Sequence, residues 1–76
     1  MTPADLAAWR QRMGYTQRAA AAALGVTLAT YQRLERGADW ADGAVVTIDR
    51  RTELACAALA AGLDGWRAPG ADTPAT

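Results

Sequence analysis

Apolar residues near the start of the chain recur at the spacing of a short amphipathic helix. Leu6, Trp9 and Met13 follow the i, i+3, i+7 rule, so they share one face of a helix. A threonine cap and a proline precede this stretch and a glycine follows it, which predicts a helix over residues 3–13. Arg10 lies on the same inward stripe, and a cation in that position requires a partner.

Two further helices of about two turns each are predicted after the first one. Their ranges are residues 17–24 and 28–36, because Thr16 and Thr27 are suitable N-caps and each range is followed by a glycine. The turn between them is short and contains a glycine. Two short helices joined in this way form a helix-turn-helix motif.

The helix over residues 17–24 contains a run of consecutive alanines. Ala20 and Ala21 face inward and would let two helix backbones approach closely, while Leu24 supplies most of the burial. For the outward alanines, helix propensity alone is an equally good explanation. These outward residues are Ala19, Ala22 and Ala23.

The helix over residues 28–36 has a polar and basic outer face. With Tyr31 directed inward, a rotation of about 100° per residue places Ala29, Arg33 and Arg36 near the opposite pole. Arginine is long enough to reach a base edge in a groove about 12 Å wide, and alanine is small enough to permit close approach. This face is therefore suited to the major groove of DNA.

The second half of the chain is patterned less clearly. Residues 38–49 contain glycine-flanked turns, Trp40 and a β-branched run, and they form either a loop whose apolar side chains close the core or a short edge strand. Asp49 is a suitable N-cap for a last helix over residues 50–61, which a glycine ends. The apolar stripe of this helix is expected to pack on the first helix or on a second copy of the chain. Its members are Leu54, Ala55, Ala58 and Leu59, with Ala57 and Ala61 beside them.

The chain divides into a domain over residues 1–62 and a tail over residues 63–76. The tail is rich in Gly, Pro, Ala and Thr, so we expect it to be flexible beyond Arg67. Trp66 is the exception, because a tryptophan at the edge of such a tail is expected to fold back onto a surface groove of the same subunit or of its mate.

Composition restricts the chemistry of this 76-residue chain. Apolar residues make up 51% of it and about half of those are alanine, which favours an all-helical bundle. One cysteine and no histidine leave no zinc site, no internal disulfide and no catalytic triad, so we predict no metal, no cofactor and no enzymatic activity. Cys56 is expected to be a small buried hydrophobe. No membrane span or secretory leader is visible, and a cytoplasmic protein is expected.

The net charge is zero, but the two halves of the chain differ in sign. Residues 1–37 carry five arginines and two acids, for a charge of +3, and residues 38–76 carry three arginines and six acids, for a charge of −3. A basic working face is therefore expected on the first half. All cations are arginine, which either reflects the base composition of the gene or suits bidentate contacts with phosphate or guanine. Arg50 and Arg51 either touch phosphates or are solvated.

The helix-turn-helix region resembles a known family, the Cro/cI-type or XRE-like helix-turn-helix regulators of phages and bacteria. The resemblance covers residues 3–37 well and 48–62 loosely. It implies an all-α, lambda-repressor-like bundle of four or five helices in which the helix over 28–36 enters the major groove. The residues that carry the resemblance are Thr16-Gln17, Ala20-Ala21, Leu24-Gly25-Val26-Thr27, Tyr31 and Glu35-Arg36-Gly37.

The resemblance also implies roles for individual residues. Gln17 would hydrogen-bond a phosphate, and Arg36 would lie near the flanking phosphate strand. Arg10 and Glu35 would form a structural ion pair, which gives the inward arginine its partner. The predicted DNA-contacting set is Gln17, Arg18, Thr27, Leu28, Ala29, Thr30, Gln32, Arg33 and Arg36.

The chain departs from the family pattern in three places. Ala20 replaces the usual leucine, so the core between the first two helices is expected to be thin. Leu28 and Ala29 replace glutamine-type residues, which leaves Arg33 as the strong hydrogen-bonding reader and thymine methyl groups as targets for the two apolar side chains. Gln32 is either a second reader or a solvated helix residue.

Two functions agree with these residues. In the first, a homodimer binds double-stranded DNA as a repressor, with two copies of the helix over 28–36 about 34 Å apart on an inverted repeat. In the second, the fold is a protein-interaction module, such as the antitoxin that binds a co-encoded toxin. The motifs and the charge asymmetry favour the first function, whereas the zero net charge and the sparse reading face favour the second.

Overall fold

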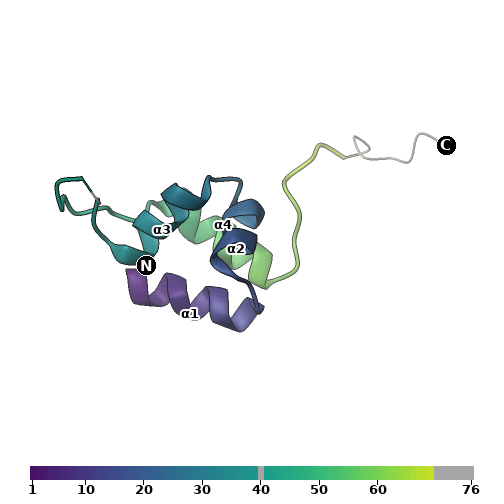
Figure 1. Cartoon of the computed structure of the whole chain (residues 1–76). Helices are drawn as coiled ribbons and strands as arrows, with labels where there is room; N and C mark the ends of the chain where they lie inside the picture. Colours follow the sequence, from purple (N-terminus) through teal and green to yellow (C-terminus); the bar gives the residue numbers. More distant parts are fainter. Residues whose placement is uncertain (40, 70–76) are drawn as a thin grey trace.

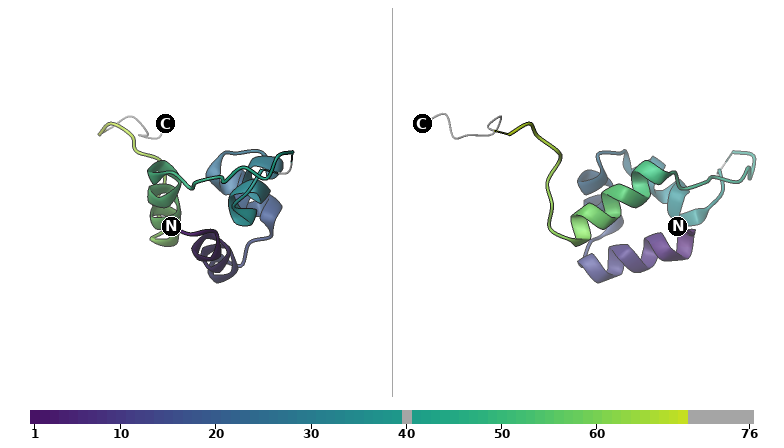
Figure 2. Two further views of the ribbon diagram at one scale, coloured as in Figure 1. Left: turned by 90° about the vertical axis from the view of Figure 1, so that its left-hand side faces the viewer. Right: turned by 180° about the vertical axis from the view of Figure 1, so that it is seen from behind.

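The computed structural model describes residues 1–39 and 41–69, and these residues contain four helices (Figure 1). All four pack around one core, with α4 in contact with α1 and α2 (Figure 2). This arrangement confirms the predicted all-α bundle with a helix-turn-helix. In chain order the helices are α1 (Pro3–Met13), α2 (Gln17–Leu24), α3 (Leu28–Arg36) and α4 (Arg50–Ala60).

Local hydrogen bonds explain why the first three helices begin where they do. Thr2 Oγ1 accepts from the backbone N–H of Asp5 at 3.1 Å, and the Asp5 carboxylate accepts from the Thr2 N–H at 2.8 Å, which completes a capping box. Thr16 and Thr27 cap α2 and α3, each by accepting from the N–H three residues later. The bounds predicted for α1, α2 and α3 are confirmed.

The core contains two large aromatic rings and two alanines. Tyr31 is fully buried and Trp9 is nearly so, and they lie in one cluster with the buried Ala20 and Ala21. The rings therefore share the space that small side chains on α2 leave. Leu24 is partly buried and packs against this cluster, whereas Ala20 and Ala21 are the buried residues of α2. The buried apolar residues are Leu6, Trp9, Ala20, Ala21, Tyr31, Ile48 and Cys56.

α4 begins after the predicted cap, Asp49, and Leu59 of the predicted stripe packs against the core, but the buried residue of the helix lies beside that stripe. Cys56 is buried, as predicted, and its carbonyl oxygen accepts from the Trp9 indole N–H at 3.0 Å. Leu54 is 54% exposed, so it does not pack on the first helix, the first of the two alternatives expected for its stripe. The buried Cys56 and its contact with Trp9 therefore mark the side of α4 that faces the core. The helix also ends at Ala60, one residue earlier than predicted.

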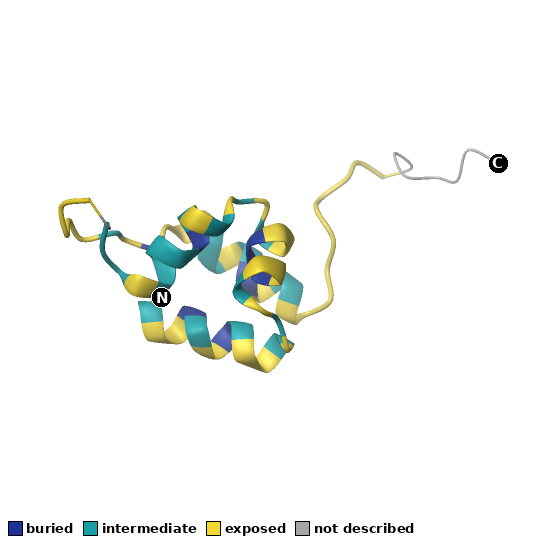
Figure 3. Cartoon of the chain, in the orientation of Figure 1, coloured by how far each residue is buried: buried dark blue, intermediate teal, exposed yellow. Residues whose placement is uncertain are grey.

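Residues 38–49 form a loop that contains an isolated antiparallel bridge between Ala38 and Val45. Ile48 closes the core at 6% exposure, as the loop alternative expected, but Val45 is 86% exposed and does not. Figure 3 shows the outer part of this loop as an exposed projection from the bundle. The expectation for Trp40 lies outside the described residues.

Residues 63–69 leave the bundle as an extended, exposed segment (Figures 1 and 3). Trp66 is 87% exposed, so the expectation that it folds back onto a groove of its own subunit is wrong. The flexibility expected beyond Arg67 concerns chiefly residues 70–76, which lie outside the described residues.

No helix among the described residues has the length and apolar character that crossing a lipid bilayer requires. Within the same residues, no group of three His, Cys, Asp or Glu side chains is arranged to hold a metal ion.

Candidate nucleic-acid interface

An ion pair between α1 and α3 fixes the orientation of the helix-turn-helix. Arg10 Nε donates to Glu35 Oε2 at 2.7 Å, and Arg10 Nη2 donates to Glu35 Oε1 at 3.2 Å. Arg10 Nη1 donates to the Tyr15 carbonyl at 3.2 Å. The two charged side chains are 20% and 11% exposed, respectively. The structure thus brings together the two residues expected to pair, in a bidentate geometry that holds both side chains in place.

The pKa of Glu35 lies below its ordinary value of 4.5. Burial would raise this pKa, but contacts with Arg10, Tyr31 and Gln17 favour the ionised carboxylate and together outweigh burial. The Tyr31 hydroxyl lies beside the carboxylate without reaching hydrogen-bonding geometry. Glu35 is therefore a charged structural residue at neutral pH.

Gln17, the first residue of α2, lies beside the end of α3. Its amide nitrogen donates to Glu35 Oε1 at 3.3 Å, and its amide oxygen accepts from the Gln32 side chain at 3.3 Å. These residues and Arg36 line a shallow pocket of about 490 Å³. Gln17, Gln32 and Arg36 are therefore gathered at the N-terminus of α2, where the first backbone N–H groups have no partner inside the helix.

The outer face of α3 holds most of the other predicted contact residues. Because Tyr31 is fully buried on the inner side, the residues on the opposite side of the helix are turned toward solvent. Arg18 is exposed on the first turn of α2. On α3 and its cap, Thr27, Ala29 and Arg36 are exposed, and Leu28, Thr30, Gln32 and Arg33 are partly exposed.

Arg33 has partners that sequence reasoning missed. Arg33 Nη1 donates to Asp39 Oδ2 at 3.3 Å, and Arg33 Nη2 donates to Thr30 Oγ1 at 3.4 Å. The pKa of Asp39 lies below its ordinary value because the carboxylate accepts from the Ala41 N–H and lies near Arg33. The available signal was an acid two positions after the glycine that closes α3, within reach of a basic last turn.

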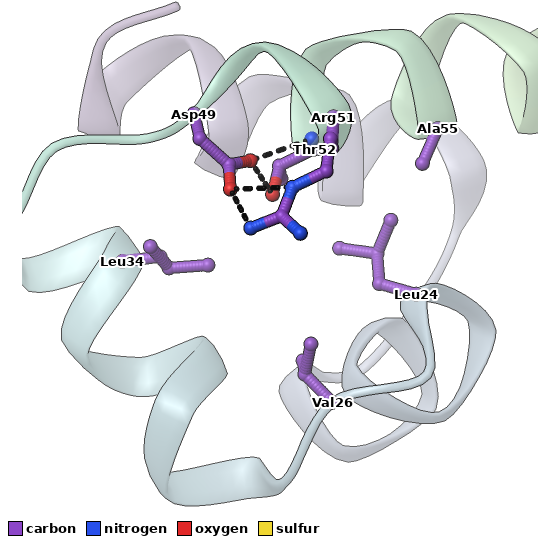
Figure 4. Close-up of a pocket in the computed structure, with 7 residues that line it drawn as sticks. All are labelled: Leu24, Val26, Leu34, Asp49, Arg51, Thr52 and Ala55. Atoms are coloured by element: carbon purple, nitrogen blue, oxygen red, sulfur yellow. Dashed lines mark hydrogen bonds and ion pairs between the residues drawn. The ribbon is translucent and has the colours of Figure 1, made fainter.

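A separate hollow of about 400 Å³ lies between the helix-turn-helix and α4 (Figure 4). Arg51 lines it and donates to Asp49 at 2.9 Å, and its side chain is 93% exposed, which agrees with the solvated alternative expected for this arginine. The hollow shares no residue with the predicted DNA-contacting set. Its lining is Leu24, Val26, Leu34, Asp49, Arg51, Thr52 and Ala55.

Two helices of this length, a three-residue turn and an exposed polar face on the second helix define a helix-turn-helix protein. Residues 6–47 match the helix-turn-helix family. The chain belongs to the XRE-like, Cro/cI-type branch of helix-turn-helix proteins, which are DNA-binding transcription regulators. Comparison with curated proteins and with solved structures gave no match.

Proposed function

We propose that this protein is a sequence-specific repressor that inserts α3 into the major groove of an operator. The observation that carries the proposal is the two-sided character of α3. Tyr31 anchors one side in the core, while Ala29, Thr30 and Arg33 lie on the side that is open to solvent. A small residue beside a long cation fits a groove that must be approached closely and read by hydrogen bonds.

The proposed contacts divide into base readers and phosphate binders. Arg33 reads guanine, and the apolar Leu28 and Ala29 meet thymine methyl groups. Gln17 and Arg36 bind phosphates beside the recognition helix, and their position around one pocket at the start of α2 supports this role. The other proposed contacts with the backbone or the groove edge are Arg18, Thr27, Thr30 and Gln32.

We infer that the operator is bound by two copies of the chain. One subunit offers few direct contacts, and such a small surface is insufficient for tight specific binding. Two copies related by a two-fold axis would place their α3 helices about 34 Å apart on an inverted repeat. The exposed Leu54 on α4 and the exposed tail leave apolar surface available for a mate.

Selection of binding sites from a random duplex pool tests this function. We expect an enriched motif with two-fold symmetry and a preferred guanine in each half-site. Arg33→Ala should weaken binding to the selected site by about 1–3 kcal/mol and relax one base position, because it removes a bidentate base contact. Gln17→Ala should weaken binding to all duplexes alike. Equal affinity for every duplex at about 0.15 M salt would overturn the proposal.

A second candidate function is an interaction module, such as an antitoxin that binds a co-encoded protein. The exposed tail favours it, since Trp66 at 87% and Leu63 at 61% exposure are large apolar side chains without cover. Co-expression with the product of the neighbouring gene would give a stable complex that Trp66→Ala weakens. The absence of a small protein encoded beside this gene would count heavily against the antitoxin role.

A further inference from the structure

The guanidinium group of Arg33 is held by two neighbours. Asp39 Oδ2 accepts from Nη1 at 3.3 Å, and Thr30 Oγ1 accepts from Nη2 at 3.4 Å. The Arg33 side chain is 41% exposed and the Asp39 side chain is 31% exposed, so the pair lies at the surface of the recognition helix. A guanidinium has five N–H donors, so these two contacts leave donors for another acceptor.

The Asp39 carboxylate is itself fixed by the loop that follows α3. Its Oδ1 accepts from the Ala41 N–H at 2.8 Å, and its backbone N–H donates to the Ala44 carbonyl at 2.8 Å. The Gly43 N–H donates to the Asp39 carbonyl at 2.9 Å. One carboxylate oxygen therefore closes a turn while the other contacts Arg33, so the loop delivers a negative charge to a defined place beside α3.

We propose that Asp39 is a positioning residue that orients Arg33 toward guanine and thereby sets the base specificity of the protein. This inference rests on the proposed reading of guanine by Arg33. A free arginine side chain loses rotamer freedom when it binds a base edge, and a fixed carboxylate reduces that loss before DNA arrives. Because bidentate contact with guanine requires the plane of the guanidinium to be aligned, orientation raises the preference for guanine over other bases.

The charge of Asp39 has a second consequence for specificity. A carboxylate near the DNA surface repels phosphates, and this repulsion weakens binding to every sequence. The contact with Arg33 offsets the loss only where guanine is present. Asp39 therefore lowers the affinity for DNA of any sequence. At the same time it raises the ratio of specific to non-specific affinity, because sequences without the guanine are bound less well.

Asp42 in the same loop provides a matched control. Its Oδ1 accepts from the Ala44 N–H at 2.9 Å, just as Asp39 accepts from the Ala41 N–H. Asp42→Ala and Asp39→Ala thus remove the same charge and one comparable turn contact, but only the second removes a partner of Arg33. Asp39→Asn keeps an oxygen for the turn and removes the charge beside Arg33, so it separates the loop from the contact.

The experiment measures equilibrium affinity of the whole protein for the selected operator and for operators with the guanine replaced. We expect Asp39→Ala and Asp39→Asn to reduce the ratio of the two affinities by about two- to fivefold, while binding to the replaced operators stays equal or becomes tighter. Asp42→Ala should leave the ratio unchanged. In an Arg33→Ala background, Asp39→Ala should no longer change the ratio.

Two outcomes overturn the inference and are distinguishable. If the unmodified protein selects sequences and Asp39→Asn, folded by circular dichroism, keeps the full guanine preference, the positioning role of Asp39 is wrong and the proposed function stands. If the unmodified protein shows no preference among duplexes, both the proposed function and the role of Asp39 are wrong.

Discussion

Removal of Arg10 should lower the stability of the protein. Arg10→Ala leaves Glu35, which is 11% exposed, without its bidentate partner. We expect the free energy of unfolding to fall by about 1–3 kcal/mol, the cost of an unsatisfied buried polar group. Arg12→Ala is the control, because Arg12 is exposed on the same helix, and it should change stability by less than about 0.5 kcal/mol. Urea denaturation measures both, and equal losses for the two variants would contradict the structural role of Arg10.

The lowered pKa of Glu35 predicts a dependence of stability on pH. Since the pKa is lower in the folded chain than its ordinary value of 4.5, folding favours the ionised form. The stabilisation is fully present above the unfolded pKa and is lost as the pH falls through the folded pKa. Urea denaturation at a series of pH values from neutral into the acid range should show a smaller loss of stability for Glu35→Gln than for the unmodified chain. Parallel curves for the two proteins would exclude a contribution from Glu35.

For single residues, the sequence was enough to predict some side-chain partners but not others. The period of the first helix directed Arg10 inward, and the family resemblance supplied its partner, Glu35. The contact between Arg33 and Asp39 had no such basis, because it depends on backbone hydrogen bonds of the turn after α3. Helical periodicity predicts the side of α3 on which Arg33 lies, but it does not predict which loop residue contacts it.

The end of α3 and the start of α1 approach each other closely at Gly37. Gly37 has a φ of 77°, and a Cβ there would lie 2.9 Å from Pro3 Cγ. Gly37→Ala should lower the free energy of unfolding by about 1–2 kcal/mol, because alanine disfavours a left-handed backbone. It should also displace Pro3, which adds to this loss. Gly25 has a similar φ of 73°, and no atom lies within 4 Å of a Cβ placed there. Gly25→Ala should therefore show only the loss that comes from the left-handed backbone.

Denaturant unfolding of the two variants checks this difference. A second measurement adds Pro3→Ala to Gly37→Ala, which removes the clashing Cγ and should recover part of the extra loss. If Gly37→Ala and Gly25→Ala are equally destabilised, the contact between α3 and Pro3 has room to relax and the packing at this junction is looser than the distance indicates.

The bounds of α1, α2 and α3 were predictable because caps and glycines act locally. The rotation of α4 about its own axis was not predictable. An alanine-rich helix has little contrast between its faces, so sequence alone could not decide whether Leu54 or Cys56 faces the core. The choice is made by a long-range contact, the hydrogen bond from Trp9 to the Cys56 carbonyl, and no local pattern encodes it.

For the whole molecule, the zero net charge conceals a basic half and an acidic half. If Arg18 and Arg36 are the cations at phosphates, the affinity of each bound subunit should fall with salt at a logarithmic slope of about −2. Arg18→Ala should reduce the magnitude of this slope by about 1 per subunit. Arg51→Ala, on the acidic half and outside the predicted DNA-contacting set, should leave it unchanged. Titrations at several salt concentrations measure the slope. An equal change in both variants would mean that the slope depends only on the total charge of the protein and not on where each arginine lies.

The burial of Cys56, 1% exposed at the meeting of α1 and α4, gives this protein a built-in reporter of core opening. It is the sole thiol of the chain, so an alkylating reagent has one target and can reach it only when the helices separate. The rate of alkylation in the absence of denaturant would therefore time that separation in the native protein. Adding operator DNA to the same reaction would reveal whether DNA bound at α3 slows this opening of the core.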